Sequence, residues 1–182
     1  MLTVTDLIYH NFYTVCALVP TIMMLILALI FLTIPKKSKA TTHMGVVFVF
    51  LSFFFAAYFL NALLYHPIGA YHRFITVITI IPITIHLSLV FFYYPFPRNT
   101  VFAKRGAIIL YCLHAIFAFI FIHILYNSPK VYSFAGHYWD FSADNPSMYY
   151  GLVILFHFII ILISGVWRAI VTKTKERWIV LA

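Results

Sequence analysis

Acidic residues are nearly absent from this sequence, which has four Asp and Glu among its 182 residues and none between Asp6 and Asp140. Charged residues of both signs make up 9% of the chain. A soluble domain carries about 25%, because water must solvate its surface. Sixteen charges cannot cover a water-facing surface of this size, and 64% of the residues are apolar. This composition excludes a soluble protein, and lipid must cover most of the surface.

The sequence also lacks the groups on which membrane enzymes and ion-coupled pumps depend. It contains no His-Glu-x-x-His motif, no paired intramembrane aspartates and no Gly-x-Ser-x-Gly elbow. Its apolar runs hold no carboxylate and no lysine. The missing lysine excludes a retinal pigment, whose Schiff base requires one, and the missing charges disfavour a pump or carrier. We therefore expect no catalytic residue and no enzyme activity in these residues.

Cysteine is scarce, and the two residues present allow at most one disulfide. Cys16 lies in the outer half of the first apolar run, and Cys112 lies near the inner end of the fourth. This spacing places the two thiols in opposite leaflets, too far apart to form a bridge. We expect two buried free thiols.

Long apolar runs are what the sequence does have. A hydrocarbon core of about 30 Å needs roughly 20 apolar residues in a helix. Five stretches meet this requirement, at residues 12–34, 46–65, 74–94, 106–126 and 148–171. They predict an all-α fold, a polytopic transmembrane helical bundle that forms one domain over residues 1–182. Pro20 and Pro82 lie inside predicted helices, where each removes a backbone hydrogen bond and favours a kink.

The positions of lysine and arginine predict the orientation, because cytoplasmic loops carry an excess of both. Ten of the twelve lie in the first loop, the third loop and the tail: Lys36, Lys37, Lys39, Arg98, Lys104, Arg105, Arg168, Lys173, Lys175 and Arg177. The other two loops hold only Arg73 and Lys130. We expect the N-terminus outside and the C-terminus in the cytoplasm. Because the basic residues sit in short clusters between apolar runs, they indicate topology, and we expect no nucleic-acid partner.

The last residues turn apolar again after the basic cluster, at Trp178 to Ala182. A tryptophan at the interface followed by aliphatic residues is how a further spanning helix begins. Two interpretations are open, a short interfacial tail or the front part of a longer protein, and we favour the second.

Four histidines lie within the apolar runs, where a polar ring is expected to have a structural or functional role. They are His86, His114, His123 and His157. Counted from the inner surface, His86 and His114 each lie roughly 12 Å deep, so they are the candidates for bis-histidine ligation of haem b. The alternative that we favour is hydrogen bonding to hydroxyls and carbonyls across helices, without a cofactor. A third interpretation is a ligand pocket or a pH-sensing role.

The longest outer loop runs from Ser128 to Ser147 and concentrates aromatic residues. Such a loop is expected to fold back onto the bilayer surface. It is also able to close an outward-facing pocket over a small ligand. The candidate ligand-binding residues are His137, Tyr138, Trp139 and Asp140.

The run AYHRFITVITIIPITIHLSLVFFYYPFPRNT places a proline inside a helix, then a histidine, then aromatics and a further proline. Together with HYWDF and WRAIVTKTKER, it resembles the N-terminal seven-helix sensor modules of bacterial signalling proteins, which precede histidine kinase, cyclase or phosphatase domains. This chain departs from that pattern, because it has five predicted helices and no effector domain. The resemblance implies a multi-pass protein of the bacterial inner (cytoplasmic) membrane.

These observations lead to two expected functions. The first is a membrane sensor or signalling input module, with the lipid bilayer and other membrane or cytoplasmic protein subunits or domains as its partners. The alternative is a non-catalytic subunit of a larger membrane complex, with a structural or haem-holding role. A transporter, a channel or a membrane enzyme is less favoured, because the spanning segments lack charges and catalytic motifs.

Overall fold

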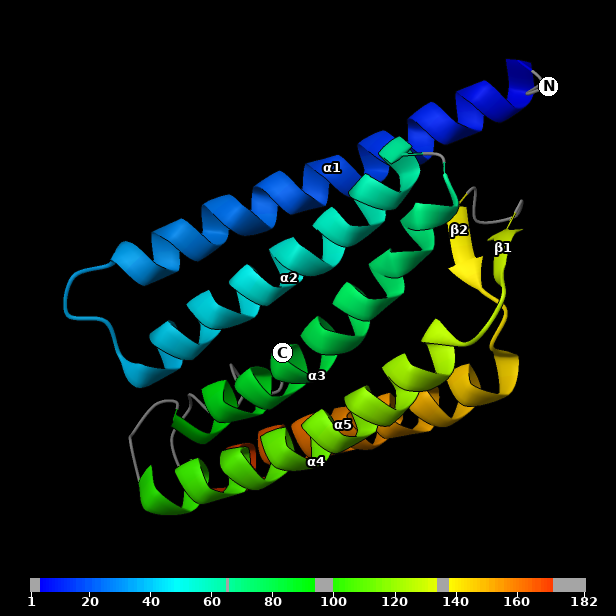
Figure 1. Ribbon diagram of the computed structural model, residues 1–182. Helices are drawn as coiled ribbons and strands as arrows, with labels where there is room; N and C mark the ends of the chain where they lie inside the picture. Colours follow the sequence, from blue (N-terminus) through cyan, green and yellow to red (C-terminus); the bar gives the residue numbers. More distant parts are fainter. Residues whose placement is uncertain (1–3, 65, 94–99, 134–137, 172–182) are drawn as a thin grey trace.

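The computed structural model describes residues 4–64, 66–93, 100–133 and 138–171, which form five long α-helices and one short β-hairpin (Figure 1). The helices are α1 (Val4–Thr33), α2 (Lys39–Leu64), α3 (His72–Tyr93), α4 (Thr100–Tyr126) and α5 (Asp144–Val171). A single 3₁₀ turn, η1 (Pro67–Tyr71), precedes α3 in the described chain. The hairpin pairs β1 (Lys130–Ser133) antiparallel to β2 (Tyr138–Phe141), with Lys130 opposite Phe141.

All five helices are long and apolar enough to cross a membrane, as predicted, which indicates a multi-pass membrane protein. Every helix begins before the apolar run that predicted it. In α2 the early start is explained by Ser38, which caps the N-terminus of the helix. The Ser38 hydroxyl oxygen accepts a hydrogen bond from the backbone N–H of Thr41 at 3.0 Å. Such caps start helices in the polar flanks, ahead of the apolar residues that sequence patterns detect.

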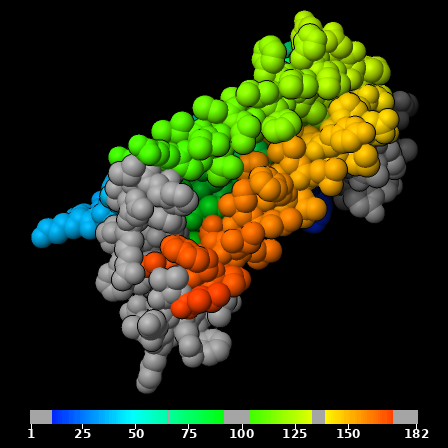
Figure 2. Space-filling model, turned by 90° about the horizontal axis from the view of Figure 1, so that it is seen from below, coloured from blue at the N-terminus to red at the C-terminus, as the bar shows by residue number. Residues whose placement is uncertain are grey.

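The third helix is the centre of the bundle. α1 packs along α2, α2 packs along α3, and α3 also contacts α4 and α5 (Figure 1). α4 and α5 contact each other little, and Figure 2 shows α3 between them on this face. Near the hairpin, α4 and α5 border an apolar groove of about 580 Å³. α3 is also the most buried of the five helices.

The two ends of the bundle differ in charge. One end, called here the basic end, carries the α1–α2 loop, the start of α4 and the last turn of α5 (Figure 1). Its described basic residues are Lys36, Lys37, Lys39, Lys104, Arg105 and Arg168. The opposite end, called here the hairpin end, carries η1, β1 and β2, with Arg73 and Lys130. The described part of the chain therefore concentrates positive charge at one end.

Two predictions need correction. Cys16 and Cys112 are free thiols as expected, but both are exposed on the helix surface, so the prediction that they are buried is wrong. The reason is that α1 and α4 each turn only a narrow face to their neighbours. The loop predicted to run from Ser128 to Ser147 ends earlier, because α5 begins at Asp144, and the loop contains the hairpin. The hairpin is the one departure, within the described residues, from an all-helical chain.

Candidate functional site

Asn61 of α2 holds the hairpin on the helices. Its side chain is 1% exposed, and its Nδ2 donates to the backbone carbonyl of Trp139 at 2.9 Å. Its Oδ1 accepts from the backbone N–H of Trp139 at 3.3 Å. The amide therefore pairs with the backbone of β2 as a neighbouring strand would. The same Nδ2 lies 2.9 Å from Nδ1 of His72, so Asn61 also ties the hairpin to the first turn of α3.

An ion pair makes the second link between the hairpin and α3. Nε of Arg73 donates to Oδ1 of Asp140 at 3.1 Å, and Nη2 of Arg73 pairs with Oδ2 of the same carboxylate. Two parallel bonds between a guanidinium and a carboxylate set the orientation of both groups. The carboxylate also accepts the backbone N–H of Phe141 at 2.8 Å. Asp140 is thus buried with its charge compensated.

Aromatic rings fill the space beneath these polar links. Phe141 stacks on Phe74 with ring centroids 5.4 Å apart, and Tyr71 meets both rings edge-on. Nζ of Lys130 lies 4.1 Å from the centroid of Tyr71, a cation–π contact. The hairpin is thereby packed onto the helices as a fixed cap.

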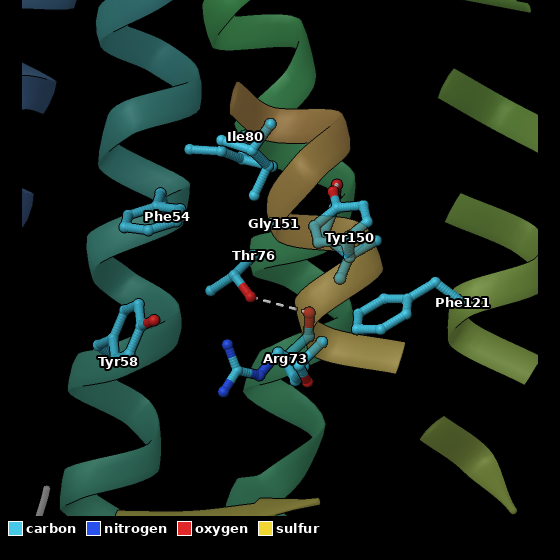
Figure 3. A pocket seen from close by; sticks show the side chains of 11 residues that line it. Phe54, Tyr58, Arg73, Thr76, Ile80, Phe121, Tyr150 and Gly151 are labelled. Carbon is cyan, nitrogen blue, oxygen red and sulfur yellow. Dashed lines mark hydrogen bonds between the residues drawn. The ribbon is translucent and has the colours of Figure 1, made fainter. Parts of the chain in front are cut away.

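A cavity of about 180 Å³, called here the hairpin-end cavity, lies next to this cap between α2, α3 and α5 (Figure 3). Arg73, Tyr58 and Thr76 supply polar groups to its wall, and most other lining side chains are apolar. The Thr76 hydroxyl donates to the backbone carbonyl of Arg73 at 2.9 Å, as Figure 3 shows. Pockets that bind drug-sized ligands have volumes of roughly 300–1,000 Å³. The hairpin-end cavity therefore suits a smaller molecule or one end of an apolar chain.

Tyr150 fixes the α5 side of this cavity. Its hydroxyl donates to the backbone carbonyl of Val77 on α3 at 2.8 Å, and its ring stacks on Phe121 of α4 with centroids 4.6 Å apart. A single side chain thus connects three helices. Neighbouring Gly151 leaves open space, since a Cβ added there meets no atom within 4 Å.

The residues predicted as ligand contacts have different positions in the structure. Asp140 and Trp139 belong to the links between hairpin and helices, where the Asp140 carboxylate is already paired with Arg73. The Trp139 ring lies against Tyr132, with centroids 5.6 Å apart. Tyr138 contributes its backbone to β2, and its side chain and all of His137 lie outside the described residues. A ligand role for the four residues stays a prediction.

His86 lies toward the basic end, paired with a histidine that the sequence analysis did not select. Its Nδ1 lies 2.8 Å from Nδ1 of His43 on α2, within hydrogen-bond distance. Its ring also approaches Tyr111 of α4, with centroids 6.0 Å apart. His43 was missed because it precedes residue 46, where the predicted second helix begins, although the observed α2 includes it.

His114 has a different partner, and Pro82 explains it. Proline has no N–H, so the carbonyl of Ile78, four residues earlier in α3, receives no helical hydrogen bond from residue 82. The His114 ring of α4 lies beside this same Ile78 backbone carbonyl. An imidazole in an apolar helix is thus placed next to a polar group that the proline leaves without a helical donor.

The structure does not bring His86 and His114 together. Ile78, the partner of His114, precedes His86 by eight residues, or about 12 Å along α3. The equal depths expected from the sequence depended on helix ends at residues 94 and 106. The observed ends, Tyr93 and Thr100, place His114 about 10 Å deeper than His86. This arrangement does not fit one haem held between these two residues.

A second buried ring, His157 of α5, lies close enough to His114 for the two to interact electrostatically. Nδ1 of His157 lies 2.8 Å from the Val153 carbonyl in its own helix. Nε2 of His157 and Nδ1 of His114 have no hydrogen-bond partner among the described residues. Of the three interpretations of the histidines, hydrogen bonding across helices describes His86, and His157 bonds within its own helix.

Three residues of the site were not selected from the sequence: Asn61, Arg73 and Tyr150. Arg73 did carry a signal, because it is the one basic residue of its loop and Asp140 lies on the same side of the membrane in the predicted topology. Tyr150 carried none, since it is one of thirteen tyrosines. Comparisons with protein-family models, with curated proteins and with solved structures found no match to this chain. The site is therefore interpreted from its own geometry.

Proposed function

We propose that this chain is a sensor module of the bacterial inner membrane that transmits occupancy of the hairpin-end cavity to its basic end. Its N-terminus and hairpin face outward, and its basic end and C-terminus face the cytoplasm, in line with the distribution of lysine and arginine. The observation that carries the proposal is the position of Pro82 in α3. Thr76, Val77 and Ile80 line the cavity before Pro82, and His86 follows it.

The missing backbone hydrogen bond at Pro82 allows α3 to change its tilt when a molecule enters the hairpin-end cavity. The Ile78 carbonyl has no helical donor at residue 82 and lies beside the His114 ring of another helix. A contact of this kind can lengthen or exchange without breaking the rest of the helix. A molecule in the cavity contacts the half of α3 before Pro82, and a change in its tilt moves the half that carries His86. A sensor requires two such arrangements, with the ligand preferring one of them.

The resemblance to seven-helix sensor modules supports this function, and it implies membrane or cytoplasmic subunits or domains that receive the signal. The module itself performs no reaction in this proposal. Its output consists of a change in helix position at the basic end, where α2, α3 and α4 come together.

A second candidate, a non-catalytic subunit of a larger membrane complex, is favoured by α1. This helix packs along α2 and leaves large apolar side chains exposed from residue 12 onward, among them Phe12, Val19, Met23, Ile26 and Ile30. In a complex, another subunit would cover this face. Purification in mild detergent distinguishes the candidates, because a subunit co-purifies with partner proteins in fixed proportion.

The sensing proposal is tested by filling the cavity with a side chain. Gly151→Phe adds a ring where the glycine leaves open space, and it imitates a bound ligand. The reporter is the imidazole ¹⁵N spectrum of histidine-labelled protein, in which His43→Gln and His86→Gln assign the signals of the pair. We expect Gly151→Phe to shift the His43 and His86 signals, because movement of α3 changes the 2.8 Å contact between them.

Two controls separate transmission from local damage. Gly151→Ala removes the glycine without filling the cavity, and Ala115→Phe adds a ring to an exposed position of α4. Both should leave the signals unchanged. If Gly151→Phe elutes as a folded protein with unshifted His43 and His86 signals, α3 does not transmit, and the proposal is wrong. Should Gly151→Phe aggregate, Gly151→Val takes its place with the same two outcomes.

A further inference from the structure

A second cavity, called here the basic-end cavity, lies at the other end of the bundle, between α2, α3 and α4. Its volume is about 380 Å³, within the range of roughly 300–1,000 Å³ that small-molecule sites occupy. The lining side chains that can carry charge or donate hydrogen bonds are Lys39, His43, His86, Lys104 and Tyr111. None of the described residues lining it is acidic. The sensing proposal does not use this cavity as a ligand site.

The two lysines come from different helices. Lys39 is the first residue of α2, and Lys104 lies near the start of α4. Both side chains are exposed, and both contribute to the lining of the cavity. Two like charges on one cavity both attract an anion that lies between them. Lysine is a common ligand of phosphate, which it binds as a point charge.

The histidine pair adds a hydrogen-bond donor. In the contact between Nδ1 of His43 and Nδ1 of His86, one ring donates and the other accepts. The accepting ring carries its hydrogen on Nε2, so the pair includes an N–H besides the one that donates within the pair. The rings of Phe50 and Tyr111 lie 6.2 Å and 6.0 Å from that of His86 and limit its movement. The pair is therefore a donor of defined position within the cavity wall.

Apolar side chains complete the lining, namely Leu89 of α3 with Ala107 and Ile108 of α4. A free inorganic anion gains nothing from such contacts, whereas an anion attached to an acyl chain buries that chain against them. The cavity lies between spanning helices, where lipids are the molecules at highest concentration. With the basic end in the cytoplasm, it faces the leaflet in which anionic lipids supply a negative surface potential.

We propose that the basic-end cavity binds the phosphate of an anionic lipid headgroup. Lys39 and Lys104 neutralise the phosphate, the His43–His86 pair donates a hydrogen bond, and Leu89 and Ile108 contact the acyl chain. This site is separate from the hairpin-end cavity, because it shares no lining residue with it.

The test is a lipid titration of the purified full chain in detergent, followed by native mass spectrometry. The probes are phosphatidic acid and phosphatidylcholine of identical acyl chains. The site variant is Lys39→Gln with Lys104→Gln. The matched control is Lys36→Gln with Lys37→Gln, which removes the same charge from the same end without touching the cavity lining. Size-exclusion elution confirms that each variant is folded.

We expect phosphatidic acid to bind the native chain more tightly than phosphatidylcholine does. The affinity of the site variant for phosphatidic acid should fall about tenfold or more, equivalent to about 1.4 kcal/mol. The affinity of the control variant should fall less than about threefold. Equal losses in both variants would show diffuse attraction to the basic end and overturn the proposal. A third arm adds inorganic phosphate as competitor. If it displaces the lipid at concentrations close to that of the lipid itself, the site takes free phosphate, and the lipid assignment is wrong.

Discussion

A single amide supplies the hydrogen bonds that β2 would otherwise take from a neighbouring strand. Asn61 bonds both the N–H and the carbonyl of Trp139, and η1 packs closely against the same side chain. Gly69 makes this approach feasible, because a Cβ at this position would overlap Oδ1 of Asn61 and lie 3.3 Å from its backbone carbonyl oxygen. At this position glycine is needed for space, and its backbone has no positive φ.

The first prediction concerns this contact. Gly69→Ala should lower the free energy of unfolding by about 1–3 kcal/mol, because the methyl group forces Asn61 away from Trp139. The matched control is Gly106→Ala, whose added Cβ meets no atom within 4 Å. That change should be neutral or stabilising by about 0.4–1 kcal/mol, since alanine restricts the unfolded chain. Tryptophan fluorescence during unfolding in detergent measures both. Equal stability of the two variants would contradict a close contact at Gly69.

At the scale of elements, α3 and α4 meet at a break in the α3 backbone. His114 of α4 lies beside the Ile78 carbonyl that Pro82 leaves without a helical donor. Pro82 is visible in the sequence, and so is His114, but their relation is not. It becomes apparent only when the helix ends fix which turn of α4 lies beside Ile78. The same offset in helix ends separates His114 from His86.

A double-mutant cycle tests whether His114 bonds to the Ile78 carbonyl. His114→Leu should lower the free energy of unfolding of the native chain by about 1–2 kcal/mol, because it leaves that carbonyl unsatisfied among apolar groups. Pro82→Ala restores a backbone N–H that bonds to the same carbonyl. In the Pro82→Ala background, His114→Leu should leave the free energy of unfolding nearly unchanged. The coupling energy between the two positions is then about 1 kcal/mol or more. Unfolding in mixed micelles measures all four proteins. Additive effects would mean that His114 does not act on the Pro82 break.

The five helices were predictable from the sequence because each one needs a long apolar run, and composition alone reveals such runs. The first residues of the helices were not predictable from the sequence, because the Ser38 cap and similar polar flanks lie outside those runs. The hairpin was not predictable either. Its strands are four residues each, and the contacts that hold them come from Asn61 and Arg73, 78 and 67 residues away in sequence from Trp139 and Asp140. Of the candidate site, Asp140 and His86 were selected, but their partners were not.

At the scale of the whole molecule, the bundle carries two cavities at opposite ends, and α3 lines both. The hairpin-end cavity lies beside an ion pair, whereas the basic-end cavity is lined by two lysines from different helices. The first is proposed to receive a ligand from outside, and the second an anionic lipid of the cytoplasmic leaflet. Both roles require that the five helices cross the bilayer and that the two ends lie on opposite sides of it.

The most direct test of this account is therefore the sidedness of the two ends. In a Cys16→Ser, Cys112→Ser background, single cysteines replace Lys37 at the basic end and Ser142 at the hairpin end, both exposed positions. A membrane-impermeant maleimide is added to intact cells, and again after permeabilisation. We predict that Ser142→Cys is labelled in intact cells and Lys37→Cys only after permeabilisation. Labelling of Lys37→Cys in intact cells, or of both positions from the same side, would contradict the account.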